Sequence, residues 1–258
     1  MSFGVSITDK MIRPAHGFLV FLLAVGACSS APSLLPSGET RLPSLFSAST
    51  VLDGLPEGWN VYRLLRFKPL TKYAVVPEGG TNVVHAVASS SASGLNQPVS
   101  VDLREFPLAE WRWKVPRLIA DADNTQPAHA DAPARVVFTF EGTREQLPDD
   151  EKLNYDLAKA LTGNPLPYAT LMYIWEPNRP EGEIVTHYNS SRVKMVIAGN
   201  SRLDLSQWHD KKVNVFEDYR RAFGEDPPRV KSVGIMSDSD NTGVSVEAFY
   251  GDIRFLKN

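Results

Sequence analysis

The feature that most constrains this fold is a series of short apolar runs that alternate with polar residues from Trp59 to the C-terminus. Alternation with a period of two is typical of β-strands whose two faces meet different surroundings. Gly, Pro, Asn and Asp separate the runs, and these residues favour turns. About ten strands of this kind fit one double-sheet domain. We therefore predict an all-β fold, an antiparallel β-sandwich, over residues 51–258.

Two segments break this pattern and predict short helical insertions. The first runs from Asp149 to Leu161, begins with acidic residues and is followed by Gly163. The apolar residues on one face of this helix are Leu153, Leu157, Ala160 and Leu161. The second helix runs from about Glu217 to Phe223 and ends at Gly224.

An apolar run from Phe18 to Ala27 precedes the single cysteine of the chain, Cys28. The run is too short to cross a bilayer as a helix but suits the core of a signal peptide. The residues Val25-Gly26-Ala27-Cys28 resemble the lipobox of bacterial lipoproteins, in which the cysteine thiol is acylated. We expect cleavage before Cys28 and lipidation of its thiol. The alternative is an ordinary secretory leader followed by a free cysteine.

These expectations divide the chain into three parts. Residues 1–27 are a signal peptide, residues 28–50 are the lipidated cysteine with a flexible tether rich in Ser and Pro, and residues 51–258 are the sandwich. The start of translation is open between Met1 and Met11. Ser29 after the cysteine resembles the outer-membrane sorting pattern of lipoproteins. We therefore expect a cell-envelope protein on the periplasmic face of the outer membrane, attached by its lipid anchor only.

Charge and cysteine content exclude some classes of protein. The formal net charge is −3, so no chain-wide basic field exists to attract nucleic acid. A single cysteine forms no internal disulfide and no cysteine-based zinc site.

Cations interrupt three of the predicted strands. In W-R-W-K-V, Trp111 and Trp113 share the core face, and Arg112 and Lys114 share the other face. The same reasoning applied to A-R-V-V-F-T-F and S-R-V-K-M-V-I places three more cations away from the core: Arg135, Arg192 and Lys194.

If these strands are neighbours, Arg112, Arg135 and Arg192 form one row on a sheet face. Such a row suits a carboxylated, sulfated or phosphorylated ligand, because arginine makes paired hydrogen bonds to planar anions. Tyr173 or Trp175 is expected to join the face from the neighbouring run L-M-Y-I-W. The alternative is a solvated sheet face with ordinary surface charges.

A loop of oxygen-bearing side chains, Asp238-Ser239-Asp240-Asn241-Thr242-Gly243, precedes the last run. Asp238 and Asp240 are candidate ligands of a structural Ca²⁺, because hard cations prefer oxygen. The loop lacks the spacing of an EF-hand. Two alternatives stay open: the side chains cap the backbone amides of their own turn, or Asp238, Asp240 and Asn241 bind sugar hydroxyls. We expect no other cofactor.

The sequence carries no motif of a nucleophilic or metal-dependent hydrolase. Paired carboxylates for glycoside hydrolysis come from different strands, so a sequence does not reveal their separation. The first candidates for such a pair are Glu176, Glu183, Asp238 and Asp240.

Several motifs in order resemble one bacterial family, the domain of unknown function 3047. They are L-P-E-G-W at Leu55, S-A-S-G-L at Ser91, W-R-W-K-V at Trp111, A-R-V-V-F at Ala134, R-A-F-G-E at Arg221, and S-D-S-D-N-T-G with Y-G-D-I. The family name implies no activity. Its general appearance is similar to the galactose-binding-like jelly rolls of carbohydrate-binding modules, which implies a jelly-roll-like sandwich. Where relatives tend to carry paired acids before A-R-V, this chain has a single acid, Asp131, so a site role there falls on that residue.

The favoured interpretation is a non-enzymatic lipoprotein that binds a glycan or another polar or anionic ligand on one sheet face. One alternative is a glycan-active hydrolase or lyase, which requires converging carboxylates beside the basic face. Another is an envelope assembly or scaffolding factor, which requires a broad apolar patch. The identity of any protein partner stays open.

Overall fold

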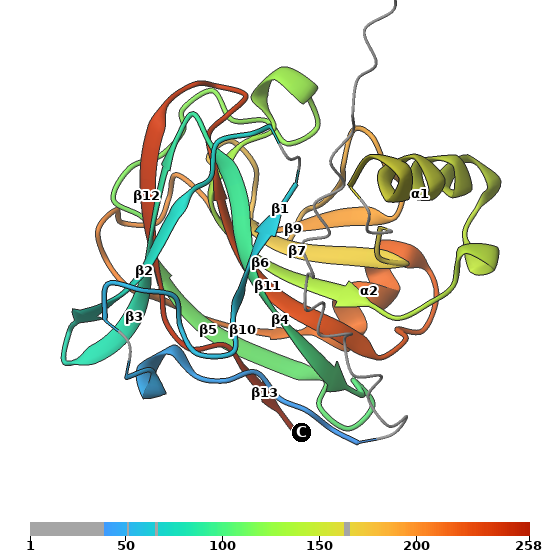
Figure 1. Cartoon of the computed structure of the whole chain (residues 1–258), viewed down its shortest axis with the longest axis horizontal. Helices are drawn as coiled ribbons and strands as arrows, with labels where there is room; N and C mark the ends of the chain where they lie inside the picture. Colours follow the sequence, from blue (N-terminus) through green and yellow to red (C-terminus); the bar gives the residue numbers. More distant parts are fainter. Residues whose placement is uncertain (1–38, 51, 65–66, 163–165) are drawn as a thin grey trace, which may run out of the picture. The chain divides into compact units, whose positions relative to one another are not determined.

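The computed structural model describes residues 39–50, 52–64, 67–162 and 166–258. The expected signal peptide and the expected lipidation site, Cys28, lie outside these residues. Strands dominate the described chain and form two sheets (Figure 1). The predicted all-β sandwich is therefore confirmed.

The seven-stranded sheet has the order β1-β4-β11-β6-β7-β9-β8. Its strands are β1 (Asn60–Arg63), β4 (Ala92–Val101), β11 (Val230–Asp238), β6 (Ala132–Phe140), β7 (Ala169–Trp175), β9 (Val193–Gly199) and β8 (Ile184–Thr186). All its pairs are antiparallel except β7 with β9. This pair is parallel because β8 reverses the chain at the sheet edge before β9 is added beside β7.

The six-stranded sheet has the order β10-β5-β12-β3-β2, and β13 also pairs with β5. Its strands are β10 (His209–Asn214), β5 (Leu108–Lys114), β12 (Ser245–Tyr250), β3 (Thr81–Ser89), β2 (Lys72–Glu78) and β13 (Arg254–Leu256). The hairpin β2–β3 turns at Gly79 and Gly80, whose φ angles of +61° and +81° suit the tight turn between two twisted strands.

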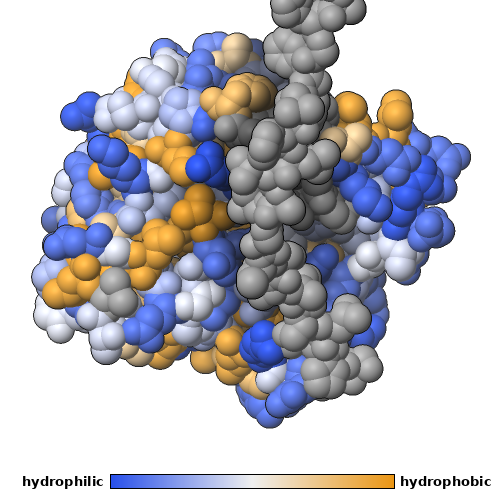
Figure 2. Space-filling model, viewed as in Figure 1, coloured by the Kyte–Doolittle hydropathy of each residue, from blue (hydrophilic) through white to orange (hydrophobic). Residues whose placement is uncertain are grey.

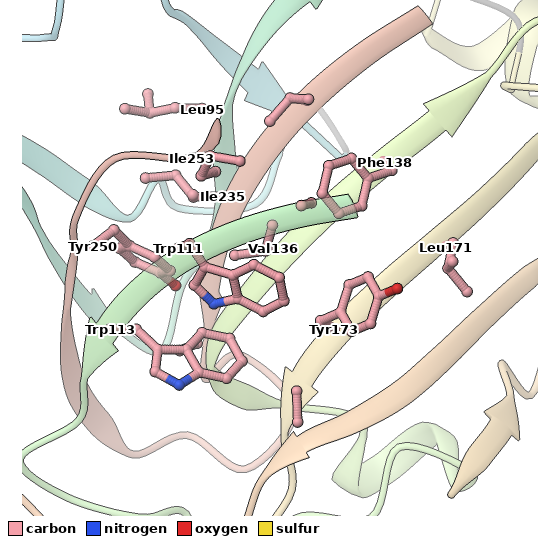
Figure 3. Packing of buried hydrophobic residues seen from close by; sticks show 14 of the residues in the cluster. Leu95, Trp111, Trp113, Val136, Phe138, Leu171, Tyr173, Ile235, Tyr250 and Ile253 are labelled. Carbon is pink, nitrogen blue, oxygen red and sulfur yellow. The ribbon is translucent and has the colours of Figure 1, made fainter. Parts of the chain in front are cut away.

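Aromatic residues from the two sheets meet in the core. Trp111 and Trp113 of β5 are buried. The ring centroid of Trp111 lies 5.2 Å from that of Tyr173 of β7, and the ring centroid of Trp113 lies 5.7 Å from that of Trp175 of β7. Figure 3 shows Trp111, Trp113 and Tyr173 between the strands that carry them. Burial alternates along β5, so Arg112 and Lys114 point away from this core, as predicted.

The segment before β1 belongs to the domain, which corrects the expected tether boundary at residue 50. Phe46 is fully buried in the short 3-10 helix η1 (Phe46–Ala48) and lies 4.7 Å from the ring of Trp59. Arg41 pairs with Ser100 through the backbone. The sequence did not reveal this contact, because a single buried aromatic residue in a Ser- and Pro-rich segment gives no periodic apolar signal.

Both predicted helices are present. Helix α1 spans Asp149–Thr162, and its Leu153 and Leu157 are 71% and 54% exposed. Figure 2 shows apolar side chains standing out over α1. Helix α2 spans Val215–Phe223 and ends at Gly224, whose φ of +73° forms a left-handed cap. Two further 3-10 turns are η2 (Pro127–His129) and η3 (Arg144–Gln146). Within the described ranges, no helix is long and apolar enough to cross a membrane.

Candidate functional site

A strip of aromatic and cationic side chains crosses the outer face of the six-stranded sheet. We call it the outer strip, and its members are His85, Phe249, Lys114, Trp208 and Arg112. The rings of His85 and Phe249 stack at 4.3 Å, the ammonium of Lys114 lies 4.1 Å from the ring centre of Phe249, and the guanidinium of Arg112 lies 4.5 Å from that of Trp208. All five are partly exposed.

Cross-strand register explains why these residues gather. Phe249 of β12 is directly opposite His85 of β3 and Lys114 of β5. Opposite residues of antiparallel strands share a face, so their side chains contact one another. Trp208 comes from the loop before β10 and reaches the same face. Lys114 also pairs with Glu78 of β2, which holds its ammonium in place over the ring.

A pocket of about 470 Å³ adjoins the strip. Its walls come from the strands β3, β5, β10 and β13, from the turn before β13 and from η1. The charged side chains that line it are Glu110, Arg112, Asp210, Lys211, Lys212, Asp252 and Arg254. The pocket therefore carries polar groups of both signs beside aromatic rings.

The structure does not bring the three predicted arginines together. Arg112 is on the six-stranded sheet, whereas Arg135 lies in β6 of the seven-stranded sheet. The expectation of one row formed by Arg112, Arg135 and Arg192 is therefore wrong. Alternation assigned a side within each strand correctly for Arg112 and Arg135, but it does not show which sheet a strand joins.

Arg135 is only 4% exposed and serves the interior. Its guanidinium donates to both carboxylate oxygens of Asp238, at 2.9 and 3.0 Å, to Asn124 Oδ1 at 2.7 Å and to the carbonyl oxygen of Ala130 at 3.0 Å. Burial raises the pKa of Asp238, and the charge of Arg135 opposes this rise. Arg135 and Asp238, two of the candidate ligand-binding residues, thus form a buried ion pair.

The predicted side of Arg192 and Lys194, away from the core, was wrong as a description of the third strand, because this strand is buried on both faces. Val196 and Ala198 of β9 join the main core, while Met195 and Ile197 join a separate buried cluster on the other face. Because β9 is buried on both faces, apolar alternation could not mark its core side. Lys194 donates to Thr186 Oγ1 at 2.7 Å.

Arg192 precedes β9 and packs beside α2. Its guanidinium lies 4.2 Å from the ring centre of Tyr168 and 4.7 Å from that of Phe223, and it pairs with Glu225 at 2.7 Å. Trp175, also expected on the basic face, is fully buried in the core. Arg192 therefore makes contacts within the fold, and Trp175 belongs to the core, so neither lies on an open basic face.

The acidic residues predicted to bind calcium do lie close together. Ligand oxygens of Asp131, Asp238 and Asp240 all lie within 4.8 Å of one another. However, Asp238 is held by Arg135, and Asp240 pairs with Lys68. Cations of the protein already neutralise Asp238 and Asp240, so these two carboxylates do not fit a calcium ion without displacement of both ion pairs.

Asp131 is fully buried and holds the loop that follows β11. Its carboxylate accepts hydrogen bonds from the backbone amide and hydroxyl of Thr242, both at 2.7 Å, and from the side-chain amide of Asn241 at 3.0 Å. This arrangement resembles the expected capping of the turn, except that the capping carboxylate comes from the segment before β6. Asn241 is an exposed donor in this contact.

The catalytic candidates do not converge on an open cleft in the described part of the chain. Glu176 is fully buried beside Asn124, and burial raises its pKa. Glu183 pairs with Arg179 at 2.7 Å. With Asp238 and Asp240 also in ion pairs, each of the four candidate carboxylates already has a partner within the fold.

Sequence reasoning found Arg112 and Lys114 but missed Trp208, Phe249 and Asp210. Trp208 is the one large aromatic residue in the polar segment before β10, and this isolated position was the signal that could have identified it. Phe249 alternates out of phase with the buried Ala248 and Tyr250, which also marks it as outward-facing.

Solved structures similar to this chain include a family 30 carbohydrate-binding module of a cellulosomal cellulase of Clostridium thermocellum, with 9% identity and a TM-score of 0.37. That match covers 83% of this chain and 96% of the module. A carbohydrate-binding module specific for non-crystalline cellulose has 14% identity and a TM-score of 0.39, covering 85% and 96%. An exo-β-agarase has 9% identity and a TM-score of 0.33, covering 84% of this chain and 25% of the enzyme. At these scores, function has to be argued from the side chains of this chain.

No curated protein matches the sequence. A family model described as "Protein of unknown function (DUF3047)" matches residues 57–254. The match covers most of the chain and confirms the resemblance indicated by the motifs. The chain belongs to the DUF3047 family.

Proposed function

We propose that this domain binds a glycan on the outer face of its six-stranded sheet. The observation that carries the proposal is the outer strip, which places three aromatic rings and two cations in partly solvated positions beside a polar pocket. Core packing does not account for these rings, because they lie on the face turned away from the tryptophan core.

The chemistry of the strip matches that of a sugar. A pyranose ring has apolar C–H faces that stack on aromatic rings and an equator of hydroxyl groups that need hydrogen-bond partners. Trp208 supplies aromatic surface, and Asp210 and Lys212, which line the pocket, supply acceptors and donors. Binding sites commonly combine an apolar lining with a few oriented polar groups in this way.

Binding fits the geometry better than catalysis does. Glycoside hydrolysis needs two carboxyl groups facing each other across an open site, with one pKa raised. The buried carboxyls with raised pKa are Glu176, Asp218 and Asp238, and none of them lines the pocket. The function proposed here is therefore a non-enzymatic one.

Substitution of Trp208 tests the proposal. A panel of oligosaccharides is screened against the full-length chain, and binders are titrated by calorimetry. Trp208→Ala should weaken binding of each glycan at least about tenfold, the scale of losing one buried aromatic contact, while the melting temperature stays close to that of the parent. Tyr188→Ala is the matched control, because Tyr188 is 45% exposed and lies outside the strip. Absence of any binder, or equal affinity in Trp208→Ala, would refute glycan binding at this face.

We also propose that the protein is lipid-anchored in the cell envelope, on the periplasmic face of the outer membrane. The support is the leader, with Val25-Gly26-Ala27 before Cys28 and Ser29 after it. A lipid anchor would leave the folded domain in the compartment where envelope glycans are found.

A further inference from the structure

We infer that the pocket beside the outer strip binds a carboxylate, so that the preferred glycan is acidic, and that Arg112 determines this specificity. The inference rests on the proposed function and names the ligand class of the same site. A uronic acid is the sugar whose chemistry fits, because it joins a planar carboxylate to a hydroxyl-bearing ring.

The guanidinium of Arg112 is uncommitted. Within the described ranges, it takes part in no hydrogen bond or ion pair, and it lies over the ring of Trp208. Two of the three other cations that line the pocket are already paired: Arg254 with Asp252 at 2.9 Å, and Lys211 with Glu181 at 2.8 Å. The third, Lys212, lies opposite Glu110 across the β10–β5 pair and carries a point charge rather than a planar fork of donors. Arg112 therefore keeps its N–H donors for a ligand.

The position of Arg112 is fixed from two sides. Trp208 stacks on the guanidinium at 4.5 Å. On the other side, Gly251 leaves the space that the arginine stem fills, because a Cβ at this position would lie 2.6 Å from Arg112 Cγ and 3.0 Å from its Nε. The backbone amide of Gly251 also donates to the carbonyl oxygen of Arg112 at 2.9 Å. A donor held in this way loses less conformational entropy when a ligand binds.

A stacked guanidinium presents its N–H groups at the edge of its plane. Two parallel N–H groups match the two coplanar oxygens of a carboxylate, which a lysine ammonium cannot do. Asp210 lies across the β10–β5 pair from Arg112 and also has no ion pair in the described chain. Its carboxylate would repel a bare anion but can accept a hydroxyl hydrogen bond, so the pocket favours an anion that carries hydroxyl groups.

The experiment compares acidic and neutral oligosaccharides on the full-length chain by calorimetry. The probes are trimers of galacturonate, glucuronate and mannuronate, each with its carboxyl-reduced counterpart, and a sulfated galactose trimer. We expect at least one uronate trimer to bind tenfold or more tightly than its reduced counterpart, the scale of a charge-assisted hydrogen-bond pair.

Three variants separate specificity from folding. Arg112→Gln should abolish the preference for the uronate trimer while binding of the reduced trimer is retained. Gly251→Ala should lower the same preference without any change in net charge, because its Cβ displaces the arginine stem. Arg104→Gln is the charge-matched control, since Arg104 is 63% exposed and does not line the pocket, and it should leave the preference intact. Thermal melting of each variant checks that it is folded.

Each other outcome overturns a defined part of the inference. If uronate and reduced trimers bind equally, or if Arg112→Gln and Gly251→Ala leave the preference unchanged, glycan binding stands but the carboxylate subsite is wrong. Tighter binding of the sulfated trimer would replace the carboxylate by a sulfate ester as the anion. If no trimer of any kind binds, the proposed function and the subsite fail together.

Discussion

At the scale of single residues, the surroundings of an arginine decide its role. Arg135 and Arg112 both face away from the tryptophan core, each in the middle of a strand. Arg135 is covered by the loop that carries Asn124 and Ala130, and it pairs with Asp238. Removing one partner of such a buried pair typically costs about 3–5 kcal/mol. Arg112 is left open beside a pocket, so its charge is available to a ligand.

Protonation of the His187 imidazole lowers the stability of the fold in acid. Burial lowers its pKa from 6.5 to about 4, and the charge of Arg135 adds to this. Its Nδ1 accepts a hydrogen bond from the backbone amide of Asn189 at 3.3 Å, which requires the unprotonated nitrogen.

Because the unfolded chain protonates this histidine near pH 6.5 and the folded chain near pH 4, its stabilising contribution is complete above pH 6.5 and is lost as the pH falls between these values. The loss is at most about 1.4 kcal/mol per pH unit. His187→Gln should flatten the fall in unfolding free energy between pH 7 and pH 4.5, measured by urea titration. Parallel pH curves for the parent and His187→Gln would show that another group causes the fall.

At the scale of elements, the segment before β1 acts as part of the sandwich although it contains no strand. Phe46 fills a site against Trp59, and Ser47 donates to Asp252 through its amide at 2.8 Å and its hydroxyl at 2.6 Å. Asp252 and Ser47 also line the pocket. The segment therefore joins the core to the candidate site.

Phe46→Ala should lower the free energy of unfolding by about 3–5 kcal/mol, the range for truncating a buried aromatic side chain. Ser47→Ala, one residue along the same turn, removes one hydroxyl hydrogen bond and should cost only about 1 kcal/mol. Chemical denaturation of both variants provides the comparison. A cost below 1 kcal/mol for Phe46→Ala would place the segment outside the cooperative unit and restore the expected tether boundary.

At the scale of the whole molecule, the two outer faces of the sandwich differ. On the outer face of the seven-stranded sheet, Met195, Ile197 and Arg135 are buried. On the six-stranded sheet, aromatic rings and cations are partly exposed beside a pocket. One face is therefore closed by the protein itself, and the other is open to a ligand.

The proposed anchor can be tested on the whole chain in a bacterial host. Cys28→Ala should abolish incorporation of a palmitate analogue and release the protein from the membrane fraction, because only the thiol can carry the diacylglycerol. Cys28→Ser is a closer match in size and should behave identically. Undiminished labelling of either variant would contradict lipidation at this residue.

The sequence by itself determined the strand pattern, the two helices, the buried face of β5 and the family, because alternation, turn residues and ordered motifs are local signals. It also selected Arg112 and Lys114 as outward-facing cations. It could not decide that Arg135 would be buried, that β9 would be covered on both faces, or that Phe46 would return to the core. These outcomes depend on which strands become neighbours and which loops cover them. Only the tertiary structure placed Trp208, Gly251 and Asp210 around Arg112, because they come from separate segments that meet through sheet pairing.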